Sequence, residues 1–564
     1  MPARLTRRSF LKKASTTAAA AAGLGGSVLL KGCSLRDDFD LVIREGLVVD
    51  GTGNKAFPAD LGLKDGRIAQ VGSIAAGRGQ AVIEAKGLAV APGFIDVHTH
   101  TDVQLLVNPK AESTVRQGVT TIVSGNCGSS PFPIADAVYE ETKSNLKEQY
   151  GLDLDWKDIA GFFGRLERSG TAVNYATLIG HGDLRGAVVG FNNRPPRPDE
   201  MERMKQVVAE AMKAGAFGLS SGLEYTPSSF ARPEELIALC GVVAGFKGVY
   251  ATHMRDEGDG LLQSLDESIE TAKAAGVALQ ISHLKTAYRR NWDKAAAALA
   301  RIESARRDGL DISCDRYPYV ACSTGLSAYF PDWVREGTTD EFVARLKDRK
   351  LEGRIRAHLA AQERLLGSWK EVVLSAVVTP RNKGVEGKNV LEAAAAARKG
   401  TFEFMRDLLV AERGRVDMVA FIMNEDNLKK FLAHPLVGVG TDGSALAPYG
   451  LLAAGKPHPR SYGTFPRVLG KYVRDEKILP LEAMIKKMTM LPARKFGFSQ
   501  RGIISVGAWA DLVVFDPDAV ADSATWVNPH RYPAGIPYVI VNGRLVIDRG
   551  VHTGALPGRV LNKA

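Results

Sequence analysis

The sequence predicts an α/β protein in which a parallel barrel of strands and helices carries a smaller β-rich unit. In the middle of the chain, short apolar strands alternate with amphipathic helical segments at the spacing of βα units. Short alternating strands separated by Gly, Asp and Asn turns occur near both ends, over 39–90 and 502–550. Chemically reactive side chains directly follow several of the central strands. These observations favour a (β/α)₈ barrel with an active site at one end of its strands.

Composition excludes several functional classes. The chain has 564 residues, 45% hydrophobic and 24% charged, as expected for a soluble globular protein larger than one ordinary domain. Its net charge of +10 suggests nucleic-acid binding, but residues 1–33 contain six basic residues and no acidic one. The remainder has no Lys/Arg run, zinc-finger spacing or aromatic-basic stripe. We therefore expect no nucleic-acid partner.

The first 33 residues are predicted to be a targeting segment. Thr6–Lys12 (TRRSFLK) resembles the twin-arginine export motif and precedes a weakly apolar stretch, Ala14–Leu30, that is too polar for a stable membrane span. Leu30–Cys33 resembles a lipoprotein cleavage box with an unusual lysine at its second position. Cys33 would then carry lipid; the alternatives are simple cleavage or an uncleaved anchor. We expect export by the twin-arginine machinery to the periplasm, either free or membrane-anchored.

The two ends of the mature chain are predicted to form a composite β-sandwich from 38–92 and 496–564. Its strands are expected at 40–44, 47–50, 60–64, 67–72, 81–84, 510–515 and 538–543.

The barrel is predicted to span 93–495. Its first strand runs into His98, and the further strands are expected at 120–124, 176–180, 217–220, 249–253, 278–283, 311–315, 418–422 and 437–441. Residues 330–410 are helical in pattern, rich in Ala, Lys and Arg, and longer than one crossover requires. We interpret them as an inserted lid or subdomain.

Cysteines are too sparse for a disulfide scaffold, because only four lie beyond Cys33. Cys240 lies in an apolar helical run and is expected to be a buried small hydrophobe. Cys314 and Cys322 could pair, although nothing requires it. Cys127 differs because it follows a barrel strand in a glycine-rich turn, Gly125–Gly128.

Reactive residues gather at the predicted strand ends, where barrels of this type build their active sites. His98 and His100 are one residue apart on a strand, so their imidazoles project together and provide half of a metal site. The other strand ends carry Cys127, His181, His253, His283 and Asp442. The sequence therefore predicts a shared metal site.

These residues carry a resemblance to a known family. The order His98-x-His100, His253, His283 and Asp442 is similar to that of the metal-dependent amidohydrolase superfamily. Nearly everything after residue 38 resembles the N-acyl-D-amino-acid deacylases, or D-aminoacylases, more narrowly. The motifs are GVTTIVSGNCG at Gly118–Gly128, GLSSGLEY at Gly218–Tyr225, DRYPY at Asp315–Tyr319, HPRSYGTFPRVL at His458–Leu469, LPAR at Leu491–Arg494 and PGRVL at Pro557–Leu561.

The resemblance implies a zinc hydrolase. Cys127, His253 and His283 would hold one tight zinc ion, leaving a tetrahedral position for water. His98 and His100 would contribute to a second, weaker divalent-metal site, and Asp442 also belongs to the candidate metal ligands. No lysine stands where a carboxylated bridging lysine would be expected after a middle strand. Zinc lowers the pKa of bound water toward ~7, so Asp442 is the candidate general base and acid for hydroxide attack on an amide.

The same resemblance identifies three side chains that would bind the carboxylate of the amino-acid leaving group: Lys285, Tyr317 and Arg460. A guanidinium can bind a carboxylate bidentately, and an ammonium and a phenol add donors. The implied reaction is hydrolysis of N-acyl-D-amino acids, small molecules that yield a carboxylate and a free D-amino acid. The pattern assigns no role to His181 or Glu224, and it does not predict the acyl group, the preferred side chain or the oligomeric state.

Two alternatives stay open. One is a dipeptidase or other amidase that acts on peptides containing a D-residue or on related amides. The other is an exported binding lipoprotein that kept the barrel and lost catalysis. Such a protein should lack metal ligands or the base, whereas this chain retains Cys127, His253, His283 and Asp442.

Overall fold

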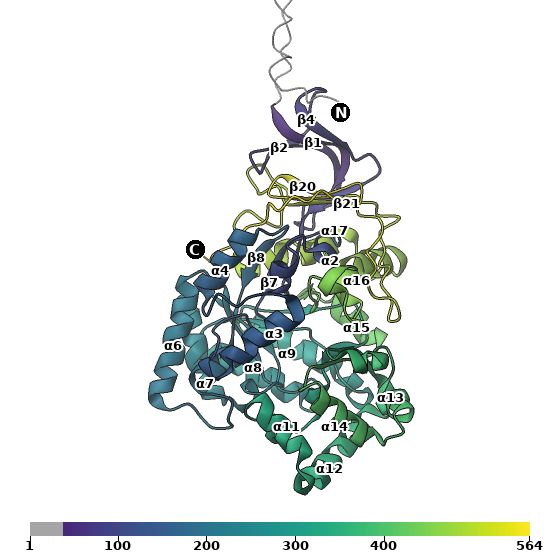
Figure 1. The fold of residues 1–564 in the computed structure, drawn as a ribbon. Helices are drawn as coiled ribbons and strands as arrows, with labels where there is room; N and C mark the ends of the chain where they lie inside the picture. The colour runs from purple at the N-terminus through teal and green to yellow at the C-terminus, as the bar shows by residue number, and fades with distance from the viewer. Residues whose placement is uncertain (1–37, 564) are drawn as a thin grey trace, which may run out of the picture.

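The computed structural model describes residues 38–563. Figure 1 shows a β-rich unit at one end of the molecule, the barrel in the middle, and the helices α11–α14 at the far end. The predicted twin-arginine motif and Cys33 lie outside the described residues. Within the described range, no helix combines the length and apolar character that crossing a membrane would require.

The central unit is the predicted parallel barrel. Its strands are β6 (Phe94–Asp96), β7 (Val119–Ser124), β8 (Asn174–Thr177) with β9 (Ile179–Gly180), β10 (Gly218–Gly222), β11 (Val249–His253), β12 (Ala278–Ile281), β13 (Ile312–Arg316) and β17 (Val437–Val439). Parallel pairing runs from β6 to β8 and from β9 to β17. The ring closes through a parallel bridge between Thr99 and Gly443. All carboxyl ends therefore meet on one face.

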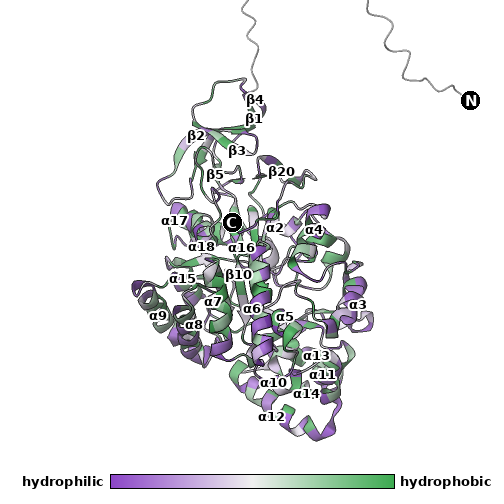
Figure 2. Ribbon diagram, turned by 90° about the vertical axis from the view of Figure 1, so that its left-hand side faces the viewer, coloured by the Kyte–Doolittle hydropathy of each residue, from purple (hydrophilic) through white to green (hydrophobic). Residues whose placement is uncertain are grey.

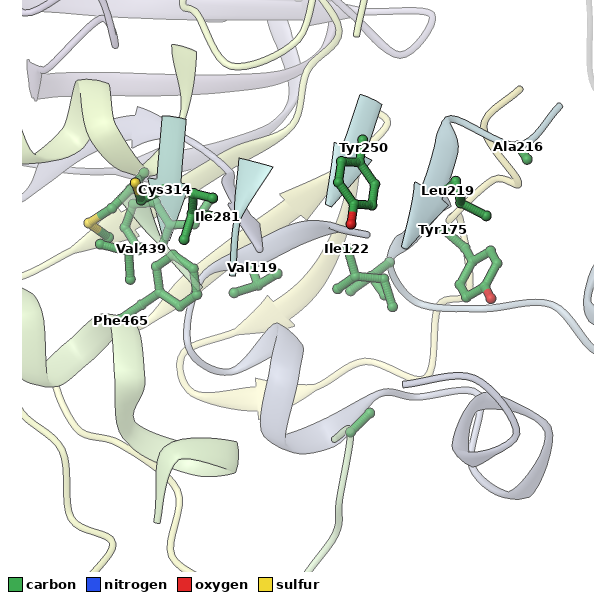
Figure 3. Packing of buried hydrophobic residues seen from close by; sticks show 14 of the residues in the cluster. Val119, Ile122, Tyr175, Ala216, Leu219, Tyr250, Ile281, Cys314, Val439 and Phe465 are labelled. Carbon is green, nitrogen blue, oxygen red and sulfur yellow. The ribbon is translucent and has the colours of Figure 1, made fainter. Parts of the chain in front are cut away.

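The strands have two packing faces because side chains alternate along them. One set packs against the surrounding helices in the main core, including Ile122, Tyr175, Leu219 and Tyr250, and Figure 3 shows these side chains in neighbouring positions. The alternate set, including Val123, packs in a smaller cluster with Phe496 and Phe498.

Helices surround the barrel in the order expected of βα units. The main ones are α5 (His181–Val188), α6 (Pro198–Lys213), α7 (Pro233–Gly245), α8 (Leu261–Ala275), α9 (Ala295–Arg307), α15 (Glu425–Ala433), α16 (Arg460–Arg467), α17 (Leu481–Met488) and α18 (Met490–Phe496). Proline at the first turn of α6 and α7 fits their starts, because that position needs no backbone N–H donor. Figure 2 shows hydrophilic residues along the outer helices, such as α6.

Both chain ends join one nine-stranded sheet. The N-terminal part supplies β1 (Phe39–Val48), β2 (Phe57–Lys64), β3 (Arg67–Gly72), β4 (Gly79–Glu84) and β5 (Ala89–Pro92), and the C-terminal part supplies β18 (Leu512–Phe515), β19 (Tyr538–Val541), β20 (Arg544–Asp548) and β21 (Val551–His552). The sheet curls, so Ile68 of β3 hydrogen-bonds to Ala508, which precedes β18. A buried ion pair between Arg501 and Asp511, with Asn542 and Asn174, ties this sheet to barrel strand β8.

The predicted barrel strand at 418–422 is wrong. Its residues belong to β16 (Val416–Ala420), which pairs antiparallel with β14 (Cys322–Gly325) and β15 (Val372–Val377) in a separate sheet. A short apolar run indicates a buried strand but does not identify the sheet that contains it.

The insertion is consequently larger and less helical than predicted from 330–410. Besides that small sheet it contains α10 (Asp332–Arg335), α11 (Thr339–Lys347), α12 (Arg349–Leu366), α13 (Val390–Ala396) and α14 (Thr401–Ala411). It has its own hydrophobic core, in which Trp369 and Leu374 are buried. The insertion is therefore a packed α+β subdomain attached to the carboxyl face of the barrel.

Candidate active site at the carboxyl ends of the barrel strands

A cavity of about 590 Å³ opens at the carboxyl face of the barrel. It is of the size that accommodates small-molecule substrates. Among the side chains predicted for the site, those that line it are His100, Cys127, His253, His283, Lys285, Tyr317, Asp442 and Arg460. His98 is fully buried beside them. The structure thus brings all nine predicted site residues to one place.

The first cluster in the cavity surrounds the Cys127 thiol. Its Sγ lies 3.3 Å from His98 Nε2 and 3.5 Å from His283 Nε2. Zinc–sulfur and zinc–nitrogen bonds of ~2.3 and ~2.05 Å at a tetrahedral angle separate the two ligand atoms by about 3.6 Å. Ligand atoms of His98, Cys127, His283 and Asp442 all lie within 4.8 Å of one another. These side chains therefore fit around a metal ion.

His253 lies on the other side of His283. Its Nε2 is 2.8 Å from a carboxylate oxygen of Glu224 and 3.8 Å from one of Glu257. His253, Glu257 and His283 form a second group with ligand atoms within 4.8 Å of one another. His283 is common to both groups, so the predicted ligands form one continuous cluster. Within it, Cys127 also interacts with His253, and this interaction contributes to lowering the pKa of the thiol.

Electrostatics favour a thiolate at Cys127. Burial opposes ionisation, but the interactions with His98 and His283 hold the pKa of the Cys127 thiol well below its usual range. Burial likewise opposes ionisation of Asp442, whereas the Arg460 guanidinium and His283 hold the pKa of its carboxyl well below normal. Both groups are therefore in the deprotonated form that binds metal.

Three of these residues have left-handed backbone conformations directly after their strands. The φ angles are +53° at Cys127, +35° at His283 and +50° at Asp442. Such angles are costly for residues other than glycine, and they concentrate at functional sites. The turn at Cys127 packs closely against Gly222. A Cβ atom at position 222 would lie 2.0 Å from the Cys127 carbonyl oxygen, so only glycine fits there.

Two buried carboxylates that sequence reasoning did not select orient the histidines. Asp315 Oδ1 accepts a hydrogen bond from the His283 backbone N–H at 2.8 Å and lies 3.3 Å from His98 Nδ1. Glu257 Oε1 lies 3.0 Å from His283 Nδ1. Carboxylates in this position fix the orientation and tautomer of metal-binding imidazoles. The available signals were the place of Asp315 in the DRYPY motif and the i, i+4 spacing of Glu257 from His253.

The predicted carboxylate-binding residues are together and buried. Lys285 Nζ donates to Glu257 Oε2 at 2.5 Å, and Arg460 Nη1 donates to Asp442 Oδ2 at 2.6 Å. The Arg460 guanidinium lies 4.9 Å from the Tyr317 ring centroid. The Tyr317 hydroxyl is buried without a hydrogen-bond partner among the described residues, and burial raises the pKa of this phenol. It is therefore a neutral donor available to a bound anion.

His181 and Glu224, to which the sequence assigned no role, have different surroundings. His181 is fully buried, with Nδ1 2.8 Å from Ser228 Oγ and Nε2 2.9 Å from Glu235, which also pairs with Arg185. It joins α5 to α7 away from the metal-binding cluster. Glu224 lines the cavity instead.

The cysteines beyond Cys127 are not bridged. Cys240, Cys314 and Cys322 are free thiols in the described part of the chain, so the suggested Cys314–Cys322 pairing does not occur. Burial raises the pKa of Cys240 and Cys314, in contrast to Cys127.

Comparison with known proteins gives concordant results. Residues 81–547 match the model of the Amidohydrolase family. The chain is 35% identical to the N-acyl-D-glutamate deacylase of Alcaligenes xylosoxydans xylosoxydans over 529 residues, covering 94% of this chain and 98% of the relative. It is also 35% identical to the D-aminoacylase of the same organism over 523 residues, covering 93% and 97%.

Among solved structures, the fold is similar to N-acyl-D-glutamate deacylase from Bordetella bronchiseptica in complex with zinc and a phosphonate mimic of the tetrahedral intermediate. The TM-score is 0.79 at 34% identity, and the match covers 93% of this chain and 100% of that one. The family model matches most of the chain, and the chain matches these relatives over nearly their whole length. The chain therefore belongs to the amidohydrolase family and, within it, to the N-acyl-D-amino-acid deacylases.

Proposed function

We propose that this protein is a zinc-dependent hydrolase that cleaves the amide bond of N-acyl-D-amino acids. The observation that carries the proposal is the convergence of the Cys127 thiolate, the histidines and Asp442 in one cavity. The Tyr317 hydroxyl lines the same cavity and has no hydrogen-bond partner within residues 38–563. Relatives named as D-aminoacylase and N-acyl-D-glutamate deacylase support it. Hydrolysis breaks the amide C–N bond, adds the OH of water to the carbonyl carbon and returns a proton to the amine.

The donor set fits zinc. We assign Cys127, His253 and His283 to the tightly held ion, and His98, His100 and Asp442 to a second, weaker divalent-metal site. Thiolate and imidazole donors select zinc over hard cations such as magnesium. Bound zinc supplies a Lewis acid that activates water and polarises the scissile carbonyl. Asp315 and Glu257 hold the imidazoles in place through their outer nitrogens.

Asp442 performs the proton transfers in this proposal. Its carboxylate is ionised, lies 3.0 Å from His100 Nε2, and faces the cavity at the end of the last barrel strand. It can take a proton from the attacking water and return it to the departing amine nitrogen. Arg460 contacts this carboxylate and also lines the cavity, so it connects the base with the place where a substrate carboxylate would bind.

Lys285, Tyr317 and Arg460 are assigned to the carboxylate of the amino-acid part. An enzyme that fixes its substrate at three separate points, the scissile carbonyl, the carboxylate and the side chain, would distinguish D from L stereochemistry. The chain is 35% identical both to the N-acyl-D-glutamate deacylase and to the D-aminoacylase, so identity favours neither side-chain preference.

The predicted location is part of the same proposal. The TRRSFLK motif and Cys33 support export through the twin-arginine machinery, with the enzyme free in the periplasm or held at its membrane by lipid. That route exports folded proteins, which suits an enzyme that must acquire zinc before crossing.

The direct test is amino-acid release by the zinc-loaded protein from a panel of racemic N-acyl amino acids, resolved by chiral chromatography. We expect release of D-enantiomers only. Release of L-amino acids, or none at all from any N-acyl amino acid, would contradict the proposal.

Replacing Asp442 with asparagine should retain the tightly bound zinc ion and lower kcat by about 10²–10⁴, because the proton acceptor is lost. Metal analysis and steady-state kinetics check this outcome. Asp259→Asn is the matched control, since Asp259 lines the same cavity but pairs with Arg290. Substantial turnover by the Asp442 variant would show that another group transfers the proton.

Cys127→Ser should lose most of its tightly bound zinc, and with it activity, because a hydroxyl is a far weaker zinc ligand than a thiolate. The control is Cys322→Ser, which removes a second thiol that lines the cavity. Burial raises the pKa of Cys322 to about 11, so it is a neutral thiol and its loss should leave zinc content unchanged. Zinc is measured by atomic emission after dialysis; equal retention by both variants would refute the assignment of Cys127.

Tyr317→Phe should raise KM for N-acyl-D-amino acids by about tenfold or more, because a hydrogen bond to a charged group contributes ~1.5–3 kcal/mol. Tyr319→Phe serves as the control, since its hydroxyl is also buried without a partner in residues 38–563 but does not line the cavity. An unchanged KM in Tyr317→Phe would remove this hydroxyl from the carboxylate site.

A further inference from the structure

Arg316 is a buried cation that the proposed reaction does not use. It is the last residue of barrel strand β13, and 1% of its surface is exposed. Its Nη2 donates to the Tyr319 carbonyl oxygen at 2.7 Å and lies 2.9 Å from Met423 Sδ. Nε and Nη1 have no hydrogen-bond partner among the described residues. Within residues 38–563 no carboxylate forms an ion pair with this guanidinium, so its charge is unbalanced.

Other buried arginines differ from Arg316 in this respect. Arg185 pairs with Glu235. Arg501 pairs with Asp511. A buried charge without a partner is strongly destabilising, so an apolar side chain at position 316 would give the more stable fold. An arginine at this position therefore indicates a role other than stability.

The Arg316 guanidinium lies against the ring of Tyr317. Its Cζ is 4.3 Å from the ring centroid, within the range of a cation–π interaction. Tyr317 lines the cavity, and its hydroxyl has no hydrogen-bond partner in the described part of the chain. Arg316 itself does not line the cavity. Tyr317 thus connects the unbalanced charge with the space in which the substrate binds.

Arg316 also fixes the turn that carries Tyr317. Its hydrogen bond to the Tyr319 carbonyl closes this turn, in which the Tyr319 N–H donates to the Tyr317 carbonyl at 3.0 Å. Burial raises the pKa of the Tyr317 phenol, whereas the charges of Lys285 and Arg316 oppose that rise. A phenol beside a positive charge is the stronger hydrogen-bond donor to an anion. Arg316 therefore acts on both the orientation and the donor strength of the hydroxyl.

We propose that Arg316 is a positioning residue for the substrate carboxylate, which it favours by holding the Tyr317 phenol and by placing an unbalanced positive charge behind it. The enzyme should then select a free carboxylate over the corresponding neutral amide. This inference rests on the proposed function, since it concerns how that site recognises the amino-acid part. Lys285, by contrast, already pairs with Glu257, so its charge is shared with a carboxylate of the protein.

Two substrates of nearly the same shape test this inference: the N-acetyl derivative of one D-amino acid and its α-carboxamide. The D-amino acid is the one released fastest in the racemic panel. We expect Arg316→Met to raise KM for the carboxylate compound about tenfold or more, and to lower the ratio of kcat/KM for carboxylate over amide by about the same factor. Zinc content and kcat should stay within about twofold of the wild type. Arg316→Lys, which keeps the charge, should retain most of the preference.

A double-mutant cycle shows whether Arg316 acts through Tyr317. In the Tyr317→Phe background, Arg316→Met should raise KM at least about threefold less than it does in the wild-type background, because the hydroxyl is absent. The matched control is the pair Arg467 and Tyr319, in which Cζ lies 4.9 Å from the ring centroid. Neither residue lines the cavity. Arg467→Met and Tyr319→Phe should therefore leave KM within about twofold of the wild type.

Different outcomes separate the two proposals. If the zinc-loaded wild type hydrolyses no N-acyl-D-amino acid, the proposed function fails. With an active wild type, the Arg316 inference is overturned if Arg316→Met leaves KM and the carboxylate preference unchanged, or if KM rises equally with and without the Tyr317 hydroxyl. Should Arg316→Met lose zinc, Arg316→Gln and Arg316→Lys decide the question. A higher KM in the glutamine variant supports the inference, and an equal KM in both overturns it.

Discussion

The site depends on keeping a thiolate ionised inside the protein. Contacts with His98 and His283 favour the ionised form of Cys127, and both imidazoles must in turn be held at 3.3–3.5 Å from the sulfur. Asp315 lies beside Nδ1 of His98, and Glu257 lies beside Nδ1 of His283. Lys285 then balances Glu257, and Arg460 balances Asp442. Anionic groups and hydrogen-bond donors or cations thus alternate outward from the sulfur, because an unbalanced buried charge would be strongly destabilising.

This alternation has a consequence for substrate binding. The cations nearest the cavity, Lys285 and Arg460, already have carboxylate partners, so a substrate carboxylate must share them with Glu257 and Asp442. Among the described residues, the Tyr317 hydroxyl has no competing acceptor. A bound substrate carboxylate therefore changes the surroundings of Glu257, which orients His283, and of Asp442, the proposed base. Recognition of the amino-acid part is in this way physically linked to the reacting centre, although the two involve different side chains.

The sequence predicted the barrel and the metal-binding cluster well, for a definable reason. A residue that directly follows a parallel strand must lie on the carboxyl face, so His98, His283 and Asp442 could be placed without coordinates. Glu257 and Asp315 were missed because their importance comes from contacts with other side chains rather than from a strand-end position. The strand expected at 418–422 was assigned to the wrong sheet because its apolar pattern contains no information about its pairing partner. Residue order likewise could not show which histidine nitrogens lie close to the Cys127 sulfur.

The insertion adds what the barrel alone lacks, a covered cavity. Tyr329, Gln362, Leu365 and Met418 all come from it and line the space above the metal-binding cluster. Its separate core around Trp369 gives these side chains a packed support independent of the barrel. By reducing contact with water it lowers the effective dielectric constant around Glu224, Lys285 and Arg460, which strengthens each charge–charge interaction there. A cavity covered in this way discriminates by charge more strongly than an open barrel end, so the charges in its wall, rather than its volume, are expected to determine which acyl groups this enzyme accepts.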